Sequence, residues 1–247
     1  MADTLTHKRA RSALSPLGEP FNGWFATRGW SPRQHQLALL EKAEKGRSAL
    51  LIAPTGAGKT LAGFLPSLVS LTAKNPRRNS PVREGPHTLY VSPLKALAVD
   101  IARNLEAPIE EMGLPVTIET RTGDTPQNRR RRQKENPPDI LLTTAEQVAL
   151  LISQPDAARF FSELEVVIVD ELHSIVTSKR GDLLSLGIAR LRQHAPNLRT
   201  VGLSATVAFP DDLRGWLAPQ HAEDDTNLAD LVVVEGGAKP DINILKS

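Results

Sequence analysis

No other stretch of this chain limits its fold as strongly as the octapeptide APTGAGKT at residues 53–60. It follows an apolar run and precedes a helical pattern, so we expect a strand, a tight loop and a helix in succession. Gly56 and Gly58 permit the backbone to turn its N–H groups inward, and the helix N-terminus adds a positive dipole end. This arrangement predicts a phosphate-binding loop within an α/β domain.

Each residue of the loop has an expected role toward a nucleoside triphosphate. The backbone of Thr55, Gly56, Ala57 and Gly58 would cradle phosphates, and Lys59 would reach the β and γ phosphates. The Thr60 hydroxyl would ligate Mg²⁺, an ion that keeps several waters and few protein ligands. Ala53 stands where the general G-x-x-x-x-G-K-T pattern has its first glycine. An ordinary glycine-containing turn is the alternative, which the Lys-Thr ending disfavours.

Two adjacent carboxylates, Asp170 and Glu171, end another apolar run 110 residues after Thr60. Because open α/β sheets bind ligands at the carboxyl ends of their strands, we expect this pair beside the phosphate loop. Asp170 would contact Mg²⁺ through water, and Glu171 would act as general base or orient the attacking water. Alone, such a pair is usually a solvated helix cap. Together with Lys59, it predicts catalysis of ATP hydrolysis.

Short apolar runs alternate with longer helical patterns along the chain, which is typical of a mostly parallel sheet covered by helices on both faces. The predicted fold is a three-layer α/β sandwich with about seven strands. The predicted strands are residues 48–53, 88–92, 116–121, 140–143, 166–170, 200–204 and 231–234. The predicted helices are residues 60–72, 94–111, 146–153 and 182–194, and residues 74–86 are expected to form an exposed loop.

Composition narrows the functional classes only modestly. The 247 residues suit one large domain, and a net charge of +2 permits a polyanionic partner without requiring one. The absence of cysteine excludes disulfides and thiolate metal sites, and the six histidines show no metal-ligand spacing. No apolar run is long enough for a signal peptide or a membrane-spanning helix, so we expect a cytoplasmic protein without membrane contact.

The tetrad Asp170-Glu171-Leu172-His173 resembles the DExH box of superfamily 2 helicases and translocases. The segment GWSPRQHQ at residues 29–36 is similar to their Q motif, which implies that Gln36 reads adenine. The resemblance implies a RecA-like P-loop fold at residues 21–219, with ATP and Mg²⁺ as cofactors. Residues 1–20 are then expected to be a flexible extension, and residues 220–247 a loop and last strand.

Other segments resemble the strand-contacting and coupling motifs of this superfamily. The resemblance implies nucleic-acid contacts at Pro93 and Lys95, at Thr122 and Gly123, and at Thr144. It also implies that His173, Ser204 and Thr206 couple hydrolysis to movement. Each short motif alone is equally typical of a turn or a helix cap, so their order and spacing carry the inference.

Within the superfamily, the chain resembles the large helicase-related group and its bacterial DNA-ligase-associated branch. This resemblance is carried by residues 24–30, by residues 178–182 with Arg190 and Leu191, and by residues 201–207 with Pro210. It implies an ATP-dependent helicase that moves 3′ to 5′ on single-stranded or partly duplex DNA in repair, with a repair ligase or nuclease as partner. It further implies a second RecA-like domain and a winged-helix region outside this chain, and therefore very slow turnover by the chain alone.

Three alternatives stay open from the residues. An RNA-directed motor shares these motifs, a non-motor module would bind nucleotide or DNA without turnover, and a small-molecule kinase would leave the strand-contacting motifs without purpose. The run of four arginines at residues 129–132 is a further ambiguity. On a helix the four side chains point around most of the circumference, which favours a solvated helix slightly over nucleic-acid contact.

Overall fold

A seven-stranded sheet organises the protein, with strand order β3-β4-β2-β5-β6-β1-β7 and parallel pairing between all neighbours. The computed structural model describes residues 17–74, 84–205, 207–219 and 228–234. The strands are β1 (Ala49–Ile52), β2 (Thr88–Val91), β3 (Ile118–Arg121), β4 (Ile140–Thr143), β5 (Val166–Val169), β6 (Arg199–Ser204) and β7 (Asp230–Val233). All seven predicted strands are therefore confirmed, with ends that shift by one or two residues.

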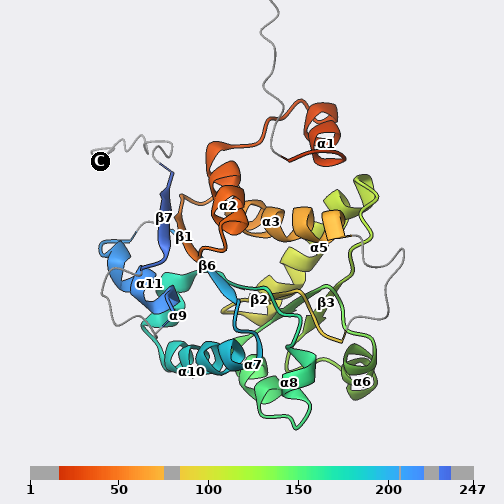
Figure 1. The fold of residues 1–247 in the computed structure, drawn as a ribbon, viewed down its shortest axis with the longest axis vertical. Helices are drawn as coiled ribbons and strands as arrows, with labels where there is room; N and C mark the ends of the chain where they lie inside the picture. Colours follow the sequence, from red (N-terminus) through yellow and green to blue (C-terminus); the bar gives the residue numbers. More distant parts are fainter. Residues whose placement is uncertain (1–16, 75–83, 206, 220–227, 235–247) are drawn as a thin grey trace, which may run out of the picture.

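Helices cover both faces of this sheet, as Figure 1 shows. The helices of the described residues are α1 (Phe21–Thr27), α2 (Gln34–Glu44), α3 (Lys59–Lys74), α5 (Lys95–Glu111), α6 (Gln127–Glu135), α7 (Ala145–Ile152), α8 (Ala157–Phe160), α9 (Leu172–Val176), α10 (Lys179–His194) and α11 (Pro210–Leu217). The four predicted helices correspond to α3, α5, α7 and α10. None of the helices in these ranges is long and apolar enough to cross a membrane.

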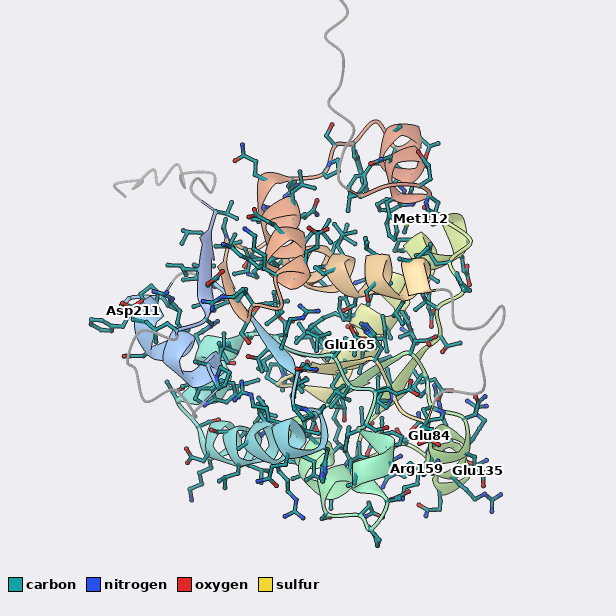
Figure 2. The ribbon with its side chains drawn as sticks, viewed as in Figure 1. Glu84, Met112, Glu135, Arg159, Glu165 and Asp211 are labelled. Atoms are coloured by element: carbon teal, nitrogen blue, oxygen red, sulfur yellow. The ribbon has the colours of Figure 1, made fainter. Side chains whose placement is uncertain are left out.

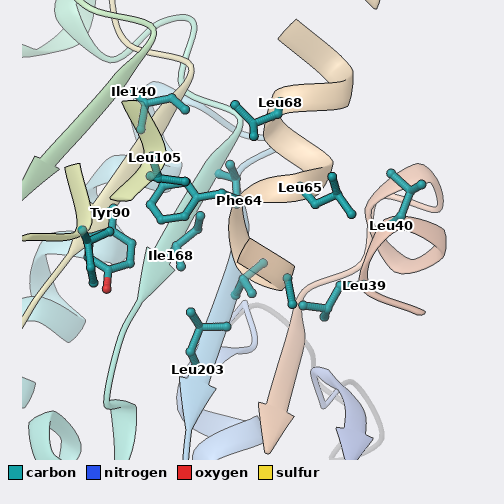
Figure 3. Packing of buried hydrophobic residues seen from close by; sticks show 14 of the residues in the cluster. Leu39, Leu40, Phe64, Leu65, Leu68, Tyr90, Leu105, Ile140, Ile168 and Leu203 are labelled. Atoms are coloured by element: carbon teal, nitrogen blue, oxygen red, sulfur yellow. The ribbon is translucent and has the colours of Figure 1, made fainter. Parts of the chain in front are cut away.

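The core consists of two apolar clusters, one on each face of the sheet. Because successive strand residues point to opposite faces, Ile140 and Leu142 of β4 join one cluster while Leu141 joins the other. The first cluster packs α2, α3 and α5 on the sheet, and Figure 3 shows Phe64 of α3 beside Tyr90 of β2. The second packs α7, α10 and α11. Burial on both faces explains why the strands read as continuous apolar runs.

The three-layer prediction is thus confirmed, whereas the predicted helices did not include α1, α2, α6, α8, α9 and α11. The helices α8 and α9 have four and five residues, too few for a helical period to be visible in the sequence. The predicted domain boundaries at residues 20 and 219 remain predictions. Most of the predicted extension, and much of residues 220–247, lies outside the described residues.

Candidate functional site

The sheet brings the two predicted loops to the same edge. In the order β5-β6-β1, Ile52 lies level with Ser204, and Val169 lies level with Gly202. Asp170 and Glu171 continue β5 up to the level at which β1 ends. Only β6 separates the two strands, and strands lie about 4.8 Å apart, so the loops start roughly 10 Å from each other. A triphosphate can span such a gap.

The phosphate loop encloses the side chain of Lys59. Gly56 and Gly58 both have positive φ, at +80° and +78°, where a side chain would strain the backbone. Lys59, the first residue of α3, is buried, and its Nζ donates a hydrogen bond of 2.9 Å to the carbonyl oxygen of Ala53. The ammonium therefore lies inside the curve of the loop. Thr60 follows it in the first turn of the helix.

Ala53 departs from the general loop pattern without cost. Its N–H donates to the Ser204 carbonyl at 3.1 Å, so this residue extends the β1–β6 pairing by one hydrogen bond. Its side chain is 1% exposed and belongs to the core cluster with α2 and α3. Ala53 directly follows β1 and does not have a positive φ, so no glycine is required at this position.

Asp170 is held from two sides. The carboxylate is 5% exposed. Its Oδ1 accepts a hydrogen bond of 2.9 Å from the Glu171 N–H, and its Oδ2 accepts one from the Tyr90 hydroxyl. Burial, and then the charge of Asp170, raise the pKa of Tyr90, so the phenol stays protonated and acts as the donor. Tyr90 was not predicted as a site residue, although its hydroxyl stands out in the otherwise apolar end of β2.

Glu171 adopts a conformation that is costly for its residue type. Its φ and ψ are 46° and 45°, the left-handed region, and among the described residues it is the only non-glycine residue with positive φ. Glu171 lies between the end of β5 at Val169 and the start of α9 at Leu172, so the chain changes direction within two residues. Such strain is often found at functional positions.

A hydrogen bond joins the acidic loop to the end of β6. The His173 Nδ1 lies 2.8 Å from the Ser204 hydroxyl and 3.6 Å from a Glu171 carboxylate oxygen. Two of the three predicted coupling residues are therefore in direct contact. The third, Thr206, lies outside the described residues.

An open pocket of about 1140 Å³ adjoins the phosphate loop, between the start of α2 and the end of β7. Thr55, Gly56 and Ala57 line it, together with Arg33 and His35. Arg33 and His35 lie in the segment 29–36 that resembles the Q motif, but they were not predicted as site residues. The pocket has room for a nucleoside next to the phosphate cradle.

Gln36 lies next to the loop but is engaged by its own helix. It is 3% exposed, and its Oε1 accepts a hydrogen bond of 2.8 Å from the Arg33 N–H at the start of α2. Its Nε2 would lie 3.8 Å from a Cβ placed on Gly58. Adenine recognition by Gln36 remains a prediction. In this structure its oxygen caps α2, and its amide nitrogen approaches the phosphate loop.

The predicted nucleic-acid residues gather at the carboxyl edge of three adjacent strands, β3, β4 and β2. The Lys95 Nζ lies 3.1 Å from both carboxylate oxygens of Asp124 and would lie 3.3 Å from a Cβ on Gly123. Thr122 lies between β3 and this contact. The structure therefore brings the segments after β2 and β3 together.

Arg180 connects the segment after β2 with the start of α7, where the other predicted nucleic-acid residues lie. It donates to the Pro93 carbonyl at 3.0 Å and pairs with Glu146 at 2.7 Å. Glu146 lies in the first turn of α7, whose N-cap is the buried Thr144. Sequence reasoning did not give Arg180 this role, because its partners lie 87 and 34 residues away in the chain.

The arginine run of α6 mostly binds within the domain. Arg129 and Arg132 pair with Glu119 at 3.0 and 2.8 Å. Arg130 donates to the carbonyls of Thr122, Gly123 and Thr125 at 3.1, 2.8 and 2.8 Å. Arg131 is largely exposed, and its Nε makes a long ion pair of 3.8 Å with a Glu135 carboxylate oxygen. The solvated-helix interpretation is supported, because Arg129, Arg131 and Arg132 are exposed. Nucleic-acid contact by this run remains a prediction.

Comparisons with known proteins agree with this geometry. A family model described as DEAD/DEAH box helicase matches residues 33–213. The chain is 42% identical to a protein named Lhr helicase/probable uracil glycosylase from Mycolicibacterium smegmatis, over 80% of this chain and 14% of that protein. It is 37% identical to an ATP-dependent helicase Lhr-Core protein 2 from Thermococcus barophilus, over 78% of this chain and 23% of that protein.

Solved structures give the same result at the level of the fold. The structure of Mycobacterium smegmatis helicase Lhr bound to ssDNA and AMP-PNP matches with a TM-score of 0.72 and 38% identity. The match covers 86% of this chain and 27% of that chain. The resemblance to the large helicase-related (Lhr) group and the RecA-like fold are therefore confirmed. The chain spans only a small part of the length of these relatives.

Proposed function

This chain belongs to the DEAD/DEAH box helicase family, and we propose that it is the ATP-binding motor domain of an ATP-dependent helicase acting on single-stranded DNA. The observation that carries the proposal is the shared sheet edge of the phosphate loop and the Asp170-Glu171 pair. In the β5-β6-β1 order, both loops can contact one triphosphate. Residues 21–219 form the proposed domain.

The residues present fit a magnesium nucleotide. The left-handed glycines at 56 and 58 leave a cradle that a Cβ would strain, and Lys59 offers a cation inside it. No cluster of three or more His, Cys, Asp or Glu that could hold a metal occurs among the described residues. This suits Mg²⁺ bound by phosphates and water, with the Thr60 hydroxyl and Asp170 as the protein ligands. When bound, Mg²⁺ neutralises charge on the phosphates.

Different residues of the chain orient the Asp170 carboxylate, accept a hydrogen bond from the attacking water and connect the site to β6. Tyr90 and the Glu171 N–H orient the Asp170 carboxylate, which fixes its direction before nucleotide binds. Glu171, about a third exposed, is free to accept a hydrogen bond from the attacking water. His173 and Ser204 connect this position to β6. Loss of the γ-phosphate next to Glu171 would then reach β6 through the hydrogen bond between His173 and Ser204.

The carboxyl edge of β3, β4 and β2 supports the strand-binding part of the proposal. Pro93, Lys95, Thr122, Gly123 and Thr144 lie on it as backbone turns, hydroxyls and one cation. Such groups suit sugar and phosphate rather than base edges, so movement without sequence reading is expected. Lys95 would exchange Asp124 for a phosphate oxygen when a strand binds.

We further propose that the enzyme moves 3′ to 5′ and acts in DNA repair with a ligase or nuclease as partner. We also propose that it belongs to the DNA-ligase-associated branch and is cytoplasmic. A second RecA-like domain, which would supply arginines across the nucleotide, and a winged-helix region complete the proposed enzyme. Such an arginine can contribute about three to five orders of magnitude to phosphoryl transfer. We therefore expect very slow turnover by this chain.

The test compares ATP hydrolysis by the complete protein carrying this domain in the presence of single-stranded DNA, single-stranded RNA or neither. We expect stimulation by DNA and a loss of turnover, with retained nucleotide binding, in the Glu171→Gln variant. Stimulation by RNA alone would replace the proposal with an RNA-directed motor. Normal hydrolysis by Glu171→Gln would contradict the assigned catalytic role.

A further inference from the structure

A cationic pocket lies between α6 and α7, outside the nucleotide site. It has a volume of about 510 Å³, and we refer to it as the α6–α7 pocket. Nine residues line it: four cations (Arg121, Arg130, Arg131 and Lys134), four carboxamides and one leucine, Leu150. No carboxylate is among them. This lining offers many hydrogen-bond donors and a strong positive charge.

Arg121 at the base of this pocket is buried without adequate compensation. The residue is 7% exposed, and its Nε has no hydrogen-bond partner among the described residues. One terminal nitrogen makes a long contact of 3.4 Å to the Arg130 carbonyl. Burial, and then the charge of Arg130, lower the pKa of the Arg121 guanidinium. A buried cation with an unused donor is costly unless an anion joins it.

The nearby carboxylates are already engaged. Glu119 holds Arg129 and Arg132, and its ionised form is favoured: burial alone would raise the pKa of Glu119, but hydrogen bonds from Gln133 and these arginines lower it. Asp156, which also attracts Arg121 at longer range, pairs with Lys134 at 3.0 Å.

No ion pair within 4 Å joins Arg121 or Arg130 to a carboxylate in the described part of the chain. Figure 2 labels Glu135 on α6 and Arg159 on α8 in this region of the molecule. The Lys134–Asp156 pair links the two segments there. The pocket therefore keeps an excess of positive charge.

The position of the pocket indicates which anion it takes. Arg121 is the last residue of β3, and the lining includes residues from the first turns of α6 and α7, so the pocket begins at the carboxyl edge of the sheet. It continues along the two helices to Lys134 and Gln154. Arg130 lines the pocket and also donates to the carbonyls of Thr122 and Gly123. A strand that crosses Thr122 and Gly123 would reach this pocket next.

We propose that the α6–α7 pocket is a phosphate subsite, which binds one backbone phosphate of a nucleic-acid strand that continues past Thr122 and Gly123. The inference rests on the proposed function and extends its strand-binding edge. Planar guanidinium groups match the geometry of a phosphate, and carboxamide N–H groups complete the shell. The contact reads no base, so it adds affinity and not sequence preference.

Two variants test the subsite in the 247-residue chain. Arg131→Gln removes an exposed cation whose ion pair is weak, so the fold is expected to be unaffected. Gln154→Glu places a carboxylate of the same shape beside Lys134, which already donates to this side chain at 3.3 Å. The control Arg103→Gln removes an exposed arginine from α5, on the opposite face of the sheet.

Binding is measured by fluorescence anisotropy with labelled oligothymidylates of about 4 and about 16 nucleotides. For the longer strand we expect Arg131→Gln to weaken binding and to reduce the slope of log K against log salt by about 0.7, the value for one phosphate on a single strand. Between about 50 and about 200 mM salt this slope change corresponds to a roughly threefold difference. Arg103→Gln should match the wild type, and the shorter strand should not distinguish the variants.

Gln154→Glu is expected to change stability and strand affinity in opposite directions. The new carboxylate satisfies the cationic pocket, so the midpoint of thermal unfolding should rise while affinity for the longer strand falls. Unchanged affinity in both Arg131→Gln and Gln154→Glu, with normal wild-type binding, would overturn the subsite alone. Absence of any strand binding by the wild type would overturn the strand-binding part of the proposed function, and this subsite with it.

Discussion

Glu171 combines a proposed catalytic role with a strained backbone, and the two can be separated by substitution. The substitution Glu171→Asn replaces the residue by one that tolerates the left-handed region far better. Glu171→Gln is the matched control, since it removes the same charge but keeps the original backbone preference. The difference between the variants therefore isolates the backbone conformation.

The expected gain follows from the observed dihedral angles. A left-handed conformation costs roughly 1–2 kcal/mol for most residues, and asparagine relieves part of this cost. We expect Glu171→Asn to exceed Glu171→Gln in free energy of unfolding by about 1 kcal/mol. For a domain of about 150–250 residues this corresponds to an increase of about 2–4 °C in the unfolding midpoint.

Thermal and denaturant unfolding of both variants measure this difference directly. Hydrolysis should be lost in both variants within the complete protein, so stability rises where activity falls. Equal midpoints for the two variants would refute the view that Glu171 is held under strain. A lower midpoint for Glu171→Asn than for Glu171→Gln would show that the longer side chain at this position stabilises the loop by contacts that outweigh the backbone cost.

Two further predictions concern buried polar groups near the site. Tyr90→Phe removes the donor to Asp170, and because hydrogen bonds to charged groups contribute about 1.5–3 kcal/mol, denaturant unfolding should report a loss of that order; an unchanged midpoint would contradict the contact. Burial, and then Arg33, lower the pKa of His35 below its unfolded value. Its contribution to stability is therefore present above the unfolded pKa and lost as pH falls through the folded one. His35→Gln should flatten the fall in unfolding midpoint between about pH 7 and about pH 5, and an identical pH profile would count against this assignment.

The sheet and the nucleotide loops were predictable because their signals are local. An apolar strand, two glycines and Lys59-Thr60 occur within a dozen residues, and Asp170 directly ends a strand. Parallel strands then place both loops at one edge regardless of the intervening chain. The fold follows from the apolar strand pattern, which recurs seven times along the chain.

The groups that support the site were not predictable, because they depend on contacts between distant segments. The Tyr90–Asp170 hydrogen bond joins residues 80 positions apart, and the Arg180–Pro93 contact joins residues 87 apart. In the sequence the Tyr90 hydroxyl stands out in the apolar end of a strand, but nothing local names Asp170 as its partner. The contact of Arg130 with the Thr122 and Gly123 carbonyls spans only eight and seven residues, but it depends on how α6 folds back on the preceding turn, which charge patterns do not indicate.

The most direct test of the account is whether Lys59 and Asp170 act on the same bound nucleotide. A double-mutant cycle of Lys59→Ala and Asp170→Asn, with affinity for a fluorescent ATP analogue measured with and without Mg²⁺, answers this question. We predict that Lys59→Ala weakens binding in both conditions, that Asp170→Asn weakens it only with Mg²⁺, and that the two effects are non-additive with Mg²⁺. Strictly additive effects, or an Asp170→Asn variant whose affinity responds to Mg²⁺ as the wild type does, would contradict a shared magnesium-nucleotide site.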